Sequence, residues 1–348
     1  MAKRFVIGTN TYLIGSQKPY ILVDAAEGLE SYLPVLASAL QGSDPTTTNL
    51  STPDVSDIII SHWHHDHVGG LPSVLSLLKN LWVGRNHGRE AEYQGPKLHK
   101  FPLDKTKAGE EHLGARNILP DIEKTLQKEL LYTAAPDGSV FQDLYDGQTF
   151  VLDKGTTTAT LLEVLHTPGH SADSICLYLP IDRALYTADT VLGHGTAVFE
   201  DLAAYMRSLN KMLRFKENQG EEAEELKSVA YDTLYPGHGD ILTNGPETIA
   251  TYIKHRLERE AQIVEVLQLP VPIELQSSNT EDRRQQQLWT IWNLVRYIYK
   301  SYPENLWLPA TRSVYLHLKK LEGEEFVRCV GGEGKDTMWE LVAIPTSL

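Results

Sequence analysis

The segment SHWHHDHVGG (residues 61–70) contains four histidines and one aspartate, side-chain types that bind transition metals. His62 and His64 are two positions apart, so on extended backbone both imidazoles project to the same side of the chain. Asp66 and His67 follow where the chain is expected to turn. This spacing can offer two imidazoles to one metal ion and a carboxylate with an imidazole to a second. A surface tract of histidines is the alternative interpretation.

Three later segments supply the ligands that such a pair of sites would still lack. HTPGHS contains His170 after an expected strand, YTADT contains Asp189 at the end of another, and YPGHG contains His238 in a turn with glycines. The combined set of five imidazoles and two carboxylates suits zinc, with iron or manganese as alternatives. The gathering of these groups at expected strand ends favours a metal centre over chance.

Other polar residues near these motifs are expected to have different roles. For His65, His194 and Trp63, packing in a loop or exposure to solvent is the favoured interpretation. Asp24, in LVDAAEG, is expected to orient a ligand histidine through a hydrogen bond and not to bind metal itself.

The elements that must position these residues have the pattern of an α/β domain. Apolar and β-branched runs predict strands over residues 4–15, 19–28, 56–61, 148–153, 156–170, 174–180 and 184–189. Amphipathic runs predict helices over residues 29–40, 70–81, 199–215 and 247–267. The polar stretch from about 85 to 145, with one helix at 120–131, is interpreted as an inserted flap or lid. The histidine cluster therefore lies on a loop at the carboxyl end of a strand, where open α/β sheets place their sites.

The end of the chain has a different pattern. WTIWNLVRYIYKSY, ATRSVYLHLKKLE and FVRCVGGEGKDTMWELV predict a helix, a second helix and a hairpin with glycines at its tip, which is the order of a winged helix. We therefore predict a catalytic domain over residues 1–250, a helix and linker over 251–288, and a small winged-helix-like domain over 289–348.

Charge weighs against one class of function, a non-catalytic protein that binds nucleic acid through the winged helix. The formal net charge of the 348 residues is −14, which repels polyanions at long range. Residues 289–348 contain seven basic and seven acidic side chains, so they lack the clustered basic surface of a domain that binds DNA tightly. Arg312, Lys319 and Lys320 could still contact phosphates.

Other features narrow the class of protein. Cys176 and Cys329 are the two cysteines, far apart in sequence, and are expected to be free thiols in a reducing compartment. The sequence contains no apolar run long enough to span a bilayer, no G-x-S-x-G motif and no P-loop. No targeting segment is visible, which favours the cytoplasm, and no membrane partner is expected. The oligomeric state stays open.

The H-x-H-x-D-H motif with the later His, Asp and His resembles the metallo-β-lactamase superfamily. More narrowly, GTNTYLIG, HWHHDHVGG, HTPGHSADS, VLGHGTAVFEDLAAYMRSL and the tail LVRYIYKSYPENL…LHLKKLE resemble the β-lactamase-like protein 2 subgroup. The resemblance implies an αββα sandwich of two mixed sheets with metals at one sheet edge. It also implies two Zn²⁺ per chain, with iron or manganese possible: one held by His62, His64 and His170, the other by Asp66, His67 and His238, with Asp189 bridging.

The resemblance implies a hydrolase in which two metals share a hydroxide that attacks phosphorus or a carbonyl carbon, with Asp66 as the catalytic residue that orients it. The subgroup includes a mitochondrial endoribonuclease that acts on single-stranded RNA, so RNA is the first expected substrate. The resemblance also makes the mitochondrial matrix an expected location beside the cytoplasm. VLGHGT carries His194 where the animal ribonuclease carries a glutamate, and it also resembles fungal thioesterases that release polyketides from acyl carrier proteins. An acyl thioester of an acyl carrier protein or of coenzyme A is therefore the alternative substrate.

Overall fold

The computed structural model describes residues 8–42, 50–103, 117–152, 161–216, 230–276 and 288–345. The chain divides into two compact units, residues 1–200 with 207–249 and residues 201–206 with 250–348. The first unit contains all the predicted metal ligands. Residues 220–228, an acidic stretch, and residues 277–287 of the predicted linker lie outside the described residues.

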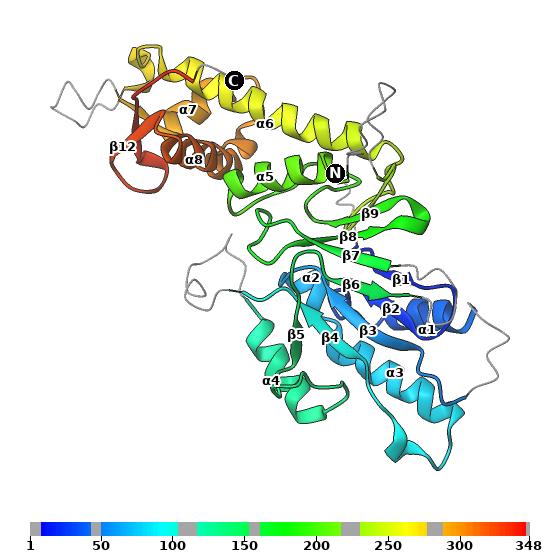
Figure 1. Cartoon of the computed structure of the whole chain (residues 1–348). Helices are drawn as coiled ribbons and strands as arrows, with labels where there is room; N and C mark the ends of the chain where they lie inside the picture. The colour runs from blue at the N-terminus through cyan, green and yellow to red at the C-terminus, as the bar shows by residue number, and fades with distance from the viewer. Residues whose placement is uncertain are drawn as a thin grey trace, which may run out of the picture. The chain divides into compact units, whose positions relative to one another are not determined.

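The first unit contains a five-stranded mixed sheet. Its strands, in spatial order, are β1 (Tyr12–Ile14), β2 (Tyr20–Val23), β3 (Val55–Ile60), β4 (Lys97–Lys100) and β5 (Phe141–Asp143). β1 pairs with β2 in antiparallel fashion, and the other neighbours are parallel. The helices that cover its outer face are α1 (Tyr32–Gly42), α3 (Leu71–Arg85) and α4 (Leu119–Glu129) (Figure 1). Leu40, Leu75 and Leu126 are fully buried in the core between these helices and the sheet.

A second mixed sheet faces the first. Its order is β10 (Thr233–Pro236), β9 (Ala184–Ala188), β8 (Ile175–Leu179), β7 (Leu161–His166) and β6 (Thr149–Val151). β10 is parallel to β9, and the other pairs are antiparallel. Helix α5 (Leu202–Leu213) follows, and its Ser208 hydroxyl, in the first unit, donates to the Pro168 carbonyl at 2.7 Å.

The two sheets of the first unit share one apolar core. Ile21, Val23 and Ile59 of the first sheet pack in it with Val164 and Leu177 of the second, and every one of these side chains is 4% exposed or less. Alternation along each strand produces this arrangement, because successive side chains point to opposite faces of a sheet. The predicted αββα sandwich is confirmed.

The interpretation of residues 85–145 as an inserted flap is wrong for the part that the structure describes. β4 and β5 in this stretch are strands of the first sheet, and Leu98 is fully buried. The polar sequence KLHK does not have the pattern of a buried strand. Its side chains are accommodated because His99 Nε2 lies 2.8 Å from Asp57 Oδ1 and Lys100 forms an ion pair with Asp173. Residues 104–116 lie outside the described residues.

The second unit contains the predicted winged helix. Its elements are most of α6 (Gly245–Leu267), then β11 (Trp289–Thr290), α7 (Ile291–Ile298), α8 (Trp307–Gly323), β12 (Val327–Gly331) and β13 (Met338–Leu341). The three strands form a sheet in the order β11-β13-β12. The Thr290 side chain caps α7 by accepting from Asn293 N at 3.0 Å. None of the described helices combines the length and apolar character that crossing a bilayer requires.

Candidate metal centre

The histidine motif begins where β3 ends. His62 and His64 follow this strand. His64 has extended backbone (φ −61°, ψ 145°) and is the last residue before the short helix α2 (His65–Val68), which contains Asp66 and His67. The turn after this helix requires a glycine at position 70, because a Cβ there would lie 2.0 Å from a backbone carbonyl oxygen. The change from strand to helix within this motif lets it supply ligands to two adjacent groups.

The remaining ligands come from loops of the second sheet. Asp189 directly follows β9, after Ala188 in the left-handed region (φ 45°). The Gly237 amide donates to the Ala188 carbonyl at 2.8 Å, which holds the loop bearing His238 beside β9. A Cβ on Gly237 would lie 2.5 Å from Asp189 Oδ1, so only glycine allows this approach.

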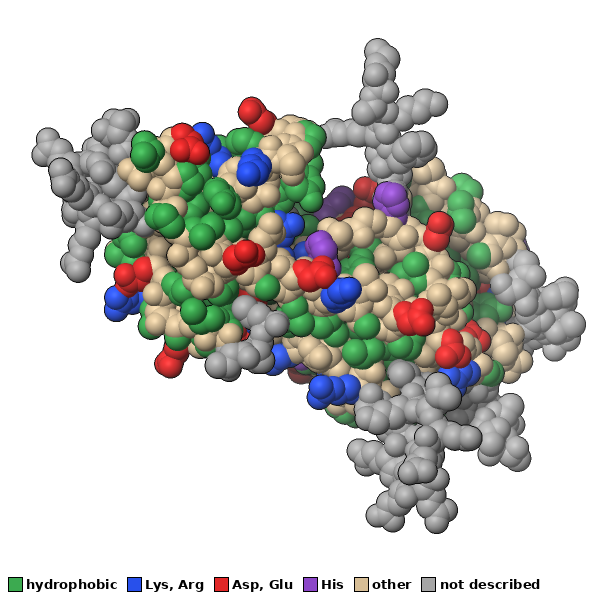
Figure 2. Space-filling model, turned by 90° about the horizontal axis from the view of Figure 1, so that it is seen from above, with side chains coloured by type: hydrophobic (Ala, Val, Ile, Leu, Met, Phe, Trp, Pro, Cys, Tyr) green, Lys and Arg blue, Asp and Glu red, His purple; other side chains and the backbone are tan. Residues whose placement is uncertain are grey.

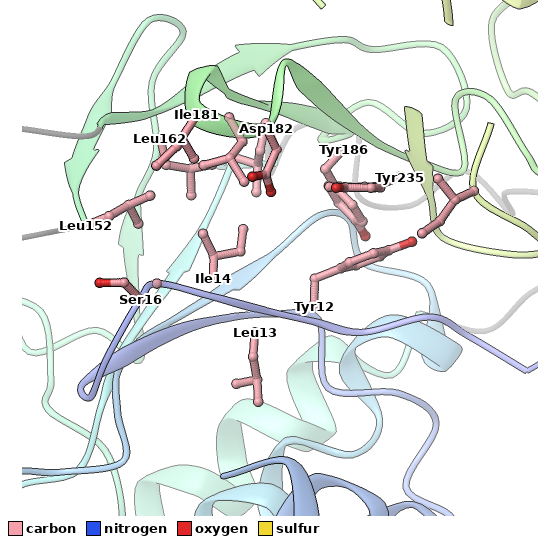
Figure 3. Close-up of a pocket in the computed structure, with 14 residues that line it drawn as sticks. Tyr12, Leu13, Ile14, Ser16, Leu152, Leu162, Ile181, Asp182, Tyr186 and Tyr235 are labelled. Atoms are coloured by element: carbon pink, nitrogen blue, oxygen red, sulfur yellow. The ribbon is translucent and has the colours of Figure 1, made fainter. Parts of the chain in front are cut away.

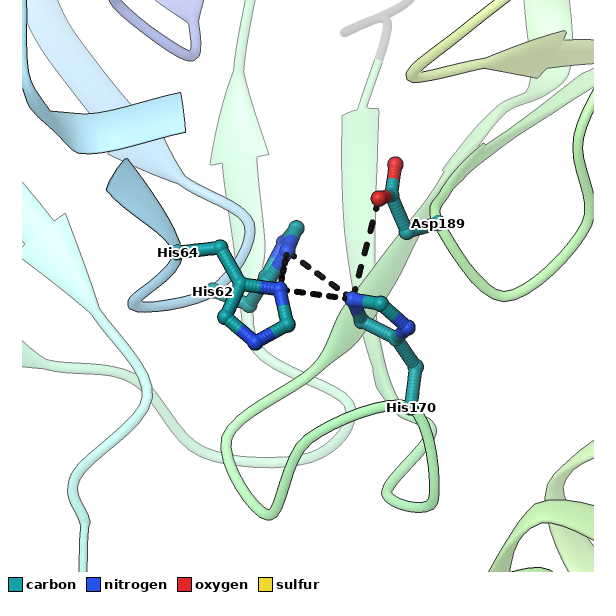
Figure 4. Close-up of side chains that lie close together, drawn as sticks. All are labelled: His62, His64, His170 and Asp189. Carbon is teal, nitrogen blue, oxygen red and sulfur yellow. Dashed lines mark hydrogen bonds and ion pairs between the residues drawn. The ribbon is translucent and has the colours of Figure 1, made fainter. Parts of the chain in front are cut away.

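Three imidazoles and one carboxylate form the first group (Figure 4). His62 Nε2 lies 3.0 Å from His64 Nδ1, and His170 Nε2 lies 3.1 Å from the former and 2.9 Å from the latter. Ligands of a tetrahedral zinc ion are about 3.3 Å apart, given Zn–N bonds of about 2.0 Å. His170 Nδ1 donates to the Val198 carbonyl at 2.8 Å, which leaves the Nε2 lone pair facing the other two rings.

Asp66, His67 and His238 form the second group. Asp66 Oδ2 lies 3.0 Å from His238 Nε2 and 3.5 Å from His67 Nε2. Asp189 lies between the two groups: its Oδ2 is 3.3 Å from His238 Nε2 and 3.7 Å from His170 Nε2. The side chains of His238 and Asp66 are 18% and 36% exposed, and histidines reach the molecular surface in Figure 2.

Asp24 fixes the orientation of the second group from behind. This fully buried carboxylate accepts hydrogen bonds from His67 Nδ1 at 2.6 Å and from the Ser61 amide and hydroxyl at 2.8 Å each, and it also bonds the Tyr186 hydroxyl. Because Nδ1 of His67 donates to Asp24, Nε2 is the ring nitrogen that faces Asp66 and Asp189. This is the role expected of Asp24 from the sequence.

The two groups differ in their protonation. Burial lowers the pKa of His62 well below its usual value and that of His64 to about 4, so both rings are neutral at pH 7. Burial alone would also lower the pKa of His238, but hydrogen bonds with Asp189 and Asp66 raise it to about 10. Burial opposes ionisation of Asp189 too, but the neighbouring His67 holds the pKa of this carboxyl well below its usual value. The first group thus offers neutral donors, whereas the second holds protons among carboxylates.

The donor set fits two divalent transition-metal ions. His67 Nε2 and Asp189 Oδ1 are buried and lie 3.4 Å apart, at the distance of an ion pair. A histidine nitrogen and a carboxylate oxygen are ligand types of zinc and similar ions, so their convergence here fits a bound cation. The nitrogens of the first group likewise face one another, an arrangement that a cation stabilises.

The residues expected to play no part as ligands lie outside the two groups. His65 is exposed, and Trp63 is buried at 3% exposure. His194 is exposed on the loop whose Gly193 amide donates to the His238 carbonyl at 2.8 Å. Sequence reasoning missed the hydroxyl of Thr9, which donates to Asp66 Oδ2 at 3.2 Å, and those of Ser61 and Tyr186, which bond Asp24. The position of Ser61 next to His62 could have indicated its role, but nothing in the sequence around Tyr186 indicated that its hydroxyl bonds Asp24.

Comparison with known proteins places this constellation in a family. A profile of the metallo-beta-lactamase superfamily matches residues 4–238. The chain belongs to the metallo-beta-lactamase superfamily. A profile of the beta-lactamase associated winged helix domain matches residues 290–339. The chain is accordingly a metal-dependent hydrolase of this superfamily with a C-terminal winged helix.

Among the relatives is the beta-lactamase-like protein 2 homolog of Drosophila melanogaster, 31% identical over 92% of this chain and 84% of its own length. Another is an atrochrysone carboxyl ACP thioesterase of Aspergillus chevalieri, 32% identical over 75% of this chain and 60% of its own length. Among solved structures, a beta-lactamase domain protein of Burkholderia ambifaria has a TM-score of 0.58 at 15% identity, covering 96% of this chain and 87% of its own. That likeness shows the fold alone.

Proposed function

We propose that the chain is a dinuclear zinc hydrolase that cuts single-stranded RNA. The observation that supports a dinuclear centre is the position of Asp189, whose carboxylate lies within 3.7 Å of a ring nitrogen in each of the two groups. One zinc ion would be held by His62, His64 and His170, and the other by Asp66, His67 and His238. When bound, such ions activate water at neutral pH and polarise the substrate. Iron or manganese would fit the same donors.

The chain's own residues would orient the reacting groups. Asp66 is the more exposed of the two carboxylates, at 36%, and the Thr9 hydroxyl holds one of its oxygens. The other oxygen can accept a hydrogen bond from a nucleophilic water, which would align it with the substrate. Asp24 has no access to solvent, so it acts through His67 and does not touch the substrate.

Two observations support RNA as the substrate. The similarity to the Drosophila relative covers 92% of the chain, and the sequence resembles a subgroup that includes a single-strand endoribonuclease. In the second unit, the Lys335 ammonium lies 4.8 Å from the ring centre of Trp292, and Arg312 lies 5.8 Å from that of Tyr315. Cations beside aromatic rings are the elements that single-strand binding surfaces use.

An acyl thioester is the second candidate substrate. The similarity to the Aspergillus thioesterase, at 32% identity over 75% of this chain, favours it. A thioester carbonyl would occupy the same place as the RNA phosphate, so the metal ligands cannot distinguish the two substrates.

A direct comparison of the two substrates tests the proposal. Purified, zinc-loaded protein is assayed on single-stranded RNA and on acyl thioesters of coenzyme A and of an acyl carrier protein. We expect RNA cleavage that spares duplexes, is lost in Asp66→Ala, and weakens in Arg312→Ala and Lys319→Ala with the metal retained. Rapid thioester hydrolysis without RNA cleavage, with Asp66→Ala as the contamination control, would reverse the assignment.

A further inference from the structure

A cavity of about 470 Å³ lies between the two sheets of the first unit, apart from the metal ligands. Fourteen residues line it. In Figure 3, Tyr12 and Ile14 of β1 face Leu162 and Tyr186 of the second sheet, and Ile181 of the turn between β8 and β9, across it. The other lining residues are Leu13, Gly15, Ser16, Leu152, Leu177, Leu179, Asp182, Tyr235 and Ile241. The volume is within the range of about 300–1,000 Å³ that is typical of small-molecule sites.

Three tyrosines form one end of this inter-sheet cavity. The Tyr12 ring stacks on Tyr235 with centroids 5.4 Å apart, and it meets the Tyr186 ring edge-on at 5.3 Å. Their hydroxyls are already engaged: Tyr12 donates to the Pro236 carbonyl at 2.9 Å, Tyr186 bonds Asp24, and Tyr235 is hydrogen-bonded to Asp182. The tyrosines can therefore contact a ligand through the faces and edges of their rings, and their hydroxyls are not available as hydrogen-bond donors.

The walls of the cavity carry almost no charge. Asp182 is the one charged residue among the fourteen that line it, and no lysine or arginine is among them. An anionic ligand would leave its charge without a partner there, which is costly in an apolar site. RNA and other phosphate-bearing molecules are therefore poor occupants, whereas aliphatic and aromatic walls suit a hydrocarbon.

We propose that the inter-sheet cavity binds an uncharged apolar molecule and that its occupancy strengthens zinc binding at the metal centre. Tyr186 and Asp24 connect the cavity to the metal centre. The Tyr186 ring lines the cavity, its hydroxyl bonds Asp24, and Asp24 accepts a hydrogen bond from His67 Nδ1 at 2.6 Å. A ligand packed against Tyr186 restricts that ring and so fixes the carboxylate that orients His67. The coupling rests on the proposed metal binding, whereas occupancy of the cavity does not.

The first experiment measures occupancy with the full-length, metal-free protein. Nile red, an uncharged apolar dye, is expected to bind with enhanced fluorescence and to be displaced by 1-decanol, with decanoate about tenfold or more weaker because its carboxylate would be unpaired. Ile14→Trp and Ile241→Trp, which fill the cavity from its two walls, should reduce dye binding. Leu29→Trp is the matched control, because Leu29 is 57% exposed and outside the cavity, as Ile241 is 53% exposed at its rim.

Absence of dye binding would overturn the proposal. So would binding that neither cavity variant weakens, provided that circular dichroism shows both variants to be folded. Equal affinity for decanol and decanoate would contradict the argument from charge.

The second experiment measures the coupling as zinc affinity with and without saturating 1-decanol. We expect decanol to tighten zinc binding about threefold or more, within the usual range of coupling between sites. Tyr235→Phe should keep this effect, and Tyr186→Phe, which removes the bond to Asp24 but keeps the ring, should abolish it.

The outcomes separate the two proposals. Unchanged zinc affinity in the presence of bound decanol would overturn the coupling while the metal centre stands. Failure of excess zinc to bind both with and without decanol would overturn the metal centre and the coupling together. An effect that persists in Tyr186→Phe would exclude the route through Asp24.

Discussion

The two groups of predicted metal ligands use the same side-chain types but differ in burial and charge. In the first, His62 and His170 are at most 2% exposed, and the rings that meet there are neutral. In the second, His238 is 18% exposed and lies 3.0 Å from Asp66, which favours the protonated ring. The first group is therefore ready to bind a cation, whereas the second must first exchange a proton for it. One short motif can thus supply two sites with different affinities.

The substitution Asp189→Ala should have the largest effect, because this side chain is the one that both groups share. We expect weaker binding of both zinc ions and a loss of turnover of about 10³-fold or more, since bound metal supplies several kcal/mol of transition-state stabilisation. Elemental analysis and the rate on the preferred substrate measure the two effects. Retention of two tightly bound ions would show that Asp189 does not join the groups.

Substitutions confined to one group should separate the sites. His238→Ala should lose the second metal and keep the first, because His238 belongs to the second group and not to the first. His170→Ala should lose the first metal, because it removes one of three converging nitrogens. Titration with Co²⁺, followed by its visible absorption, distinguishes the sites. Loss of both ions in each variant would mean that the groups do not bind independently.

Proton release should differ between the sites at pH 7. The first zinc should release no proton, since the pKa of His64 is lowered to about 4, whereas the second should release at least one, since that of His238 is raised to about 10. Affinity at the second site should therefore rise about tenfold per pH unit between roughly pH 7 and 9. Without metal the sign is opposite: the ion pairs of His238 stabilise the fold fully below pH 6.5, and this contribution is lost as pH rises through about 10.

Calorimetric titration in buffers of different ionisation enthalpy measures the protons released at each step. Release of equal numbers of protons at the two zinc-binding steps would show that the two groups do not differ in protonation.

The substitution His65→Ala should have the smallest effect. His65 is exposed on α2, between ligands of both groups, and belongs to neither. We expect activity and metal content within about twofold of the parent protein, as for most surface substitutions. Activity as low as that of Asp66→Ala, with metal still bound, would mean that the residues of the motif have been assigned to the wrong roles.

The sequence was informative where the residue type itself carries the signal. Imidazoles at strand ends predicted which residues gather, and apolar runs predicted β3, β8 and β9. Strand β4 was missed because His99 and Lys100 are polar and become acceptable in a buried strand only through Asp57 and Asp173, which are distant in sequence. Tyr186 was missed for the same reason, since its role depends on the distance between two sheets. Contacts of this kind have no local pattern that periodicity could reveal.

The ligands come from both sheets, and this has a consequence for folding. His62 follows a strand of the first sheet, and His170, which lies 108 positions later, follows a strand of the second. An ion held by both would act as a cross-link that closes a long loop of the chain, in the way that a disulfide does. Metal binding would then be part of the free energy that holds the sandwich together, and a chelator would lower the melting temperature as well as the activity.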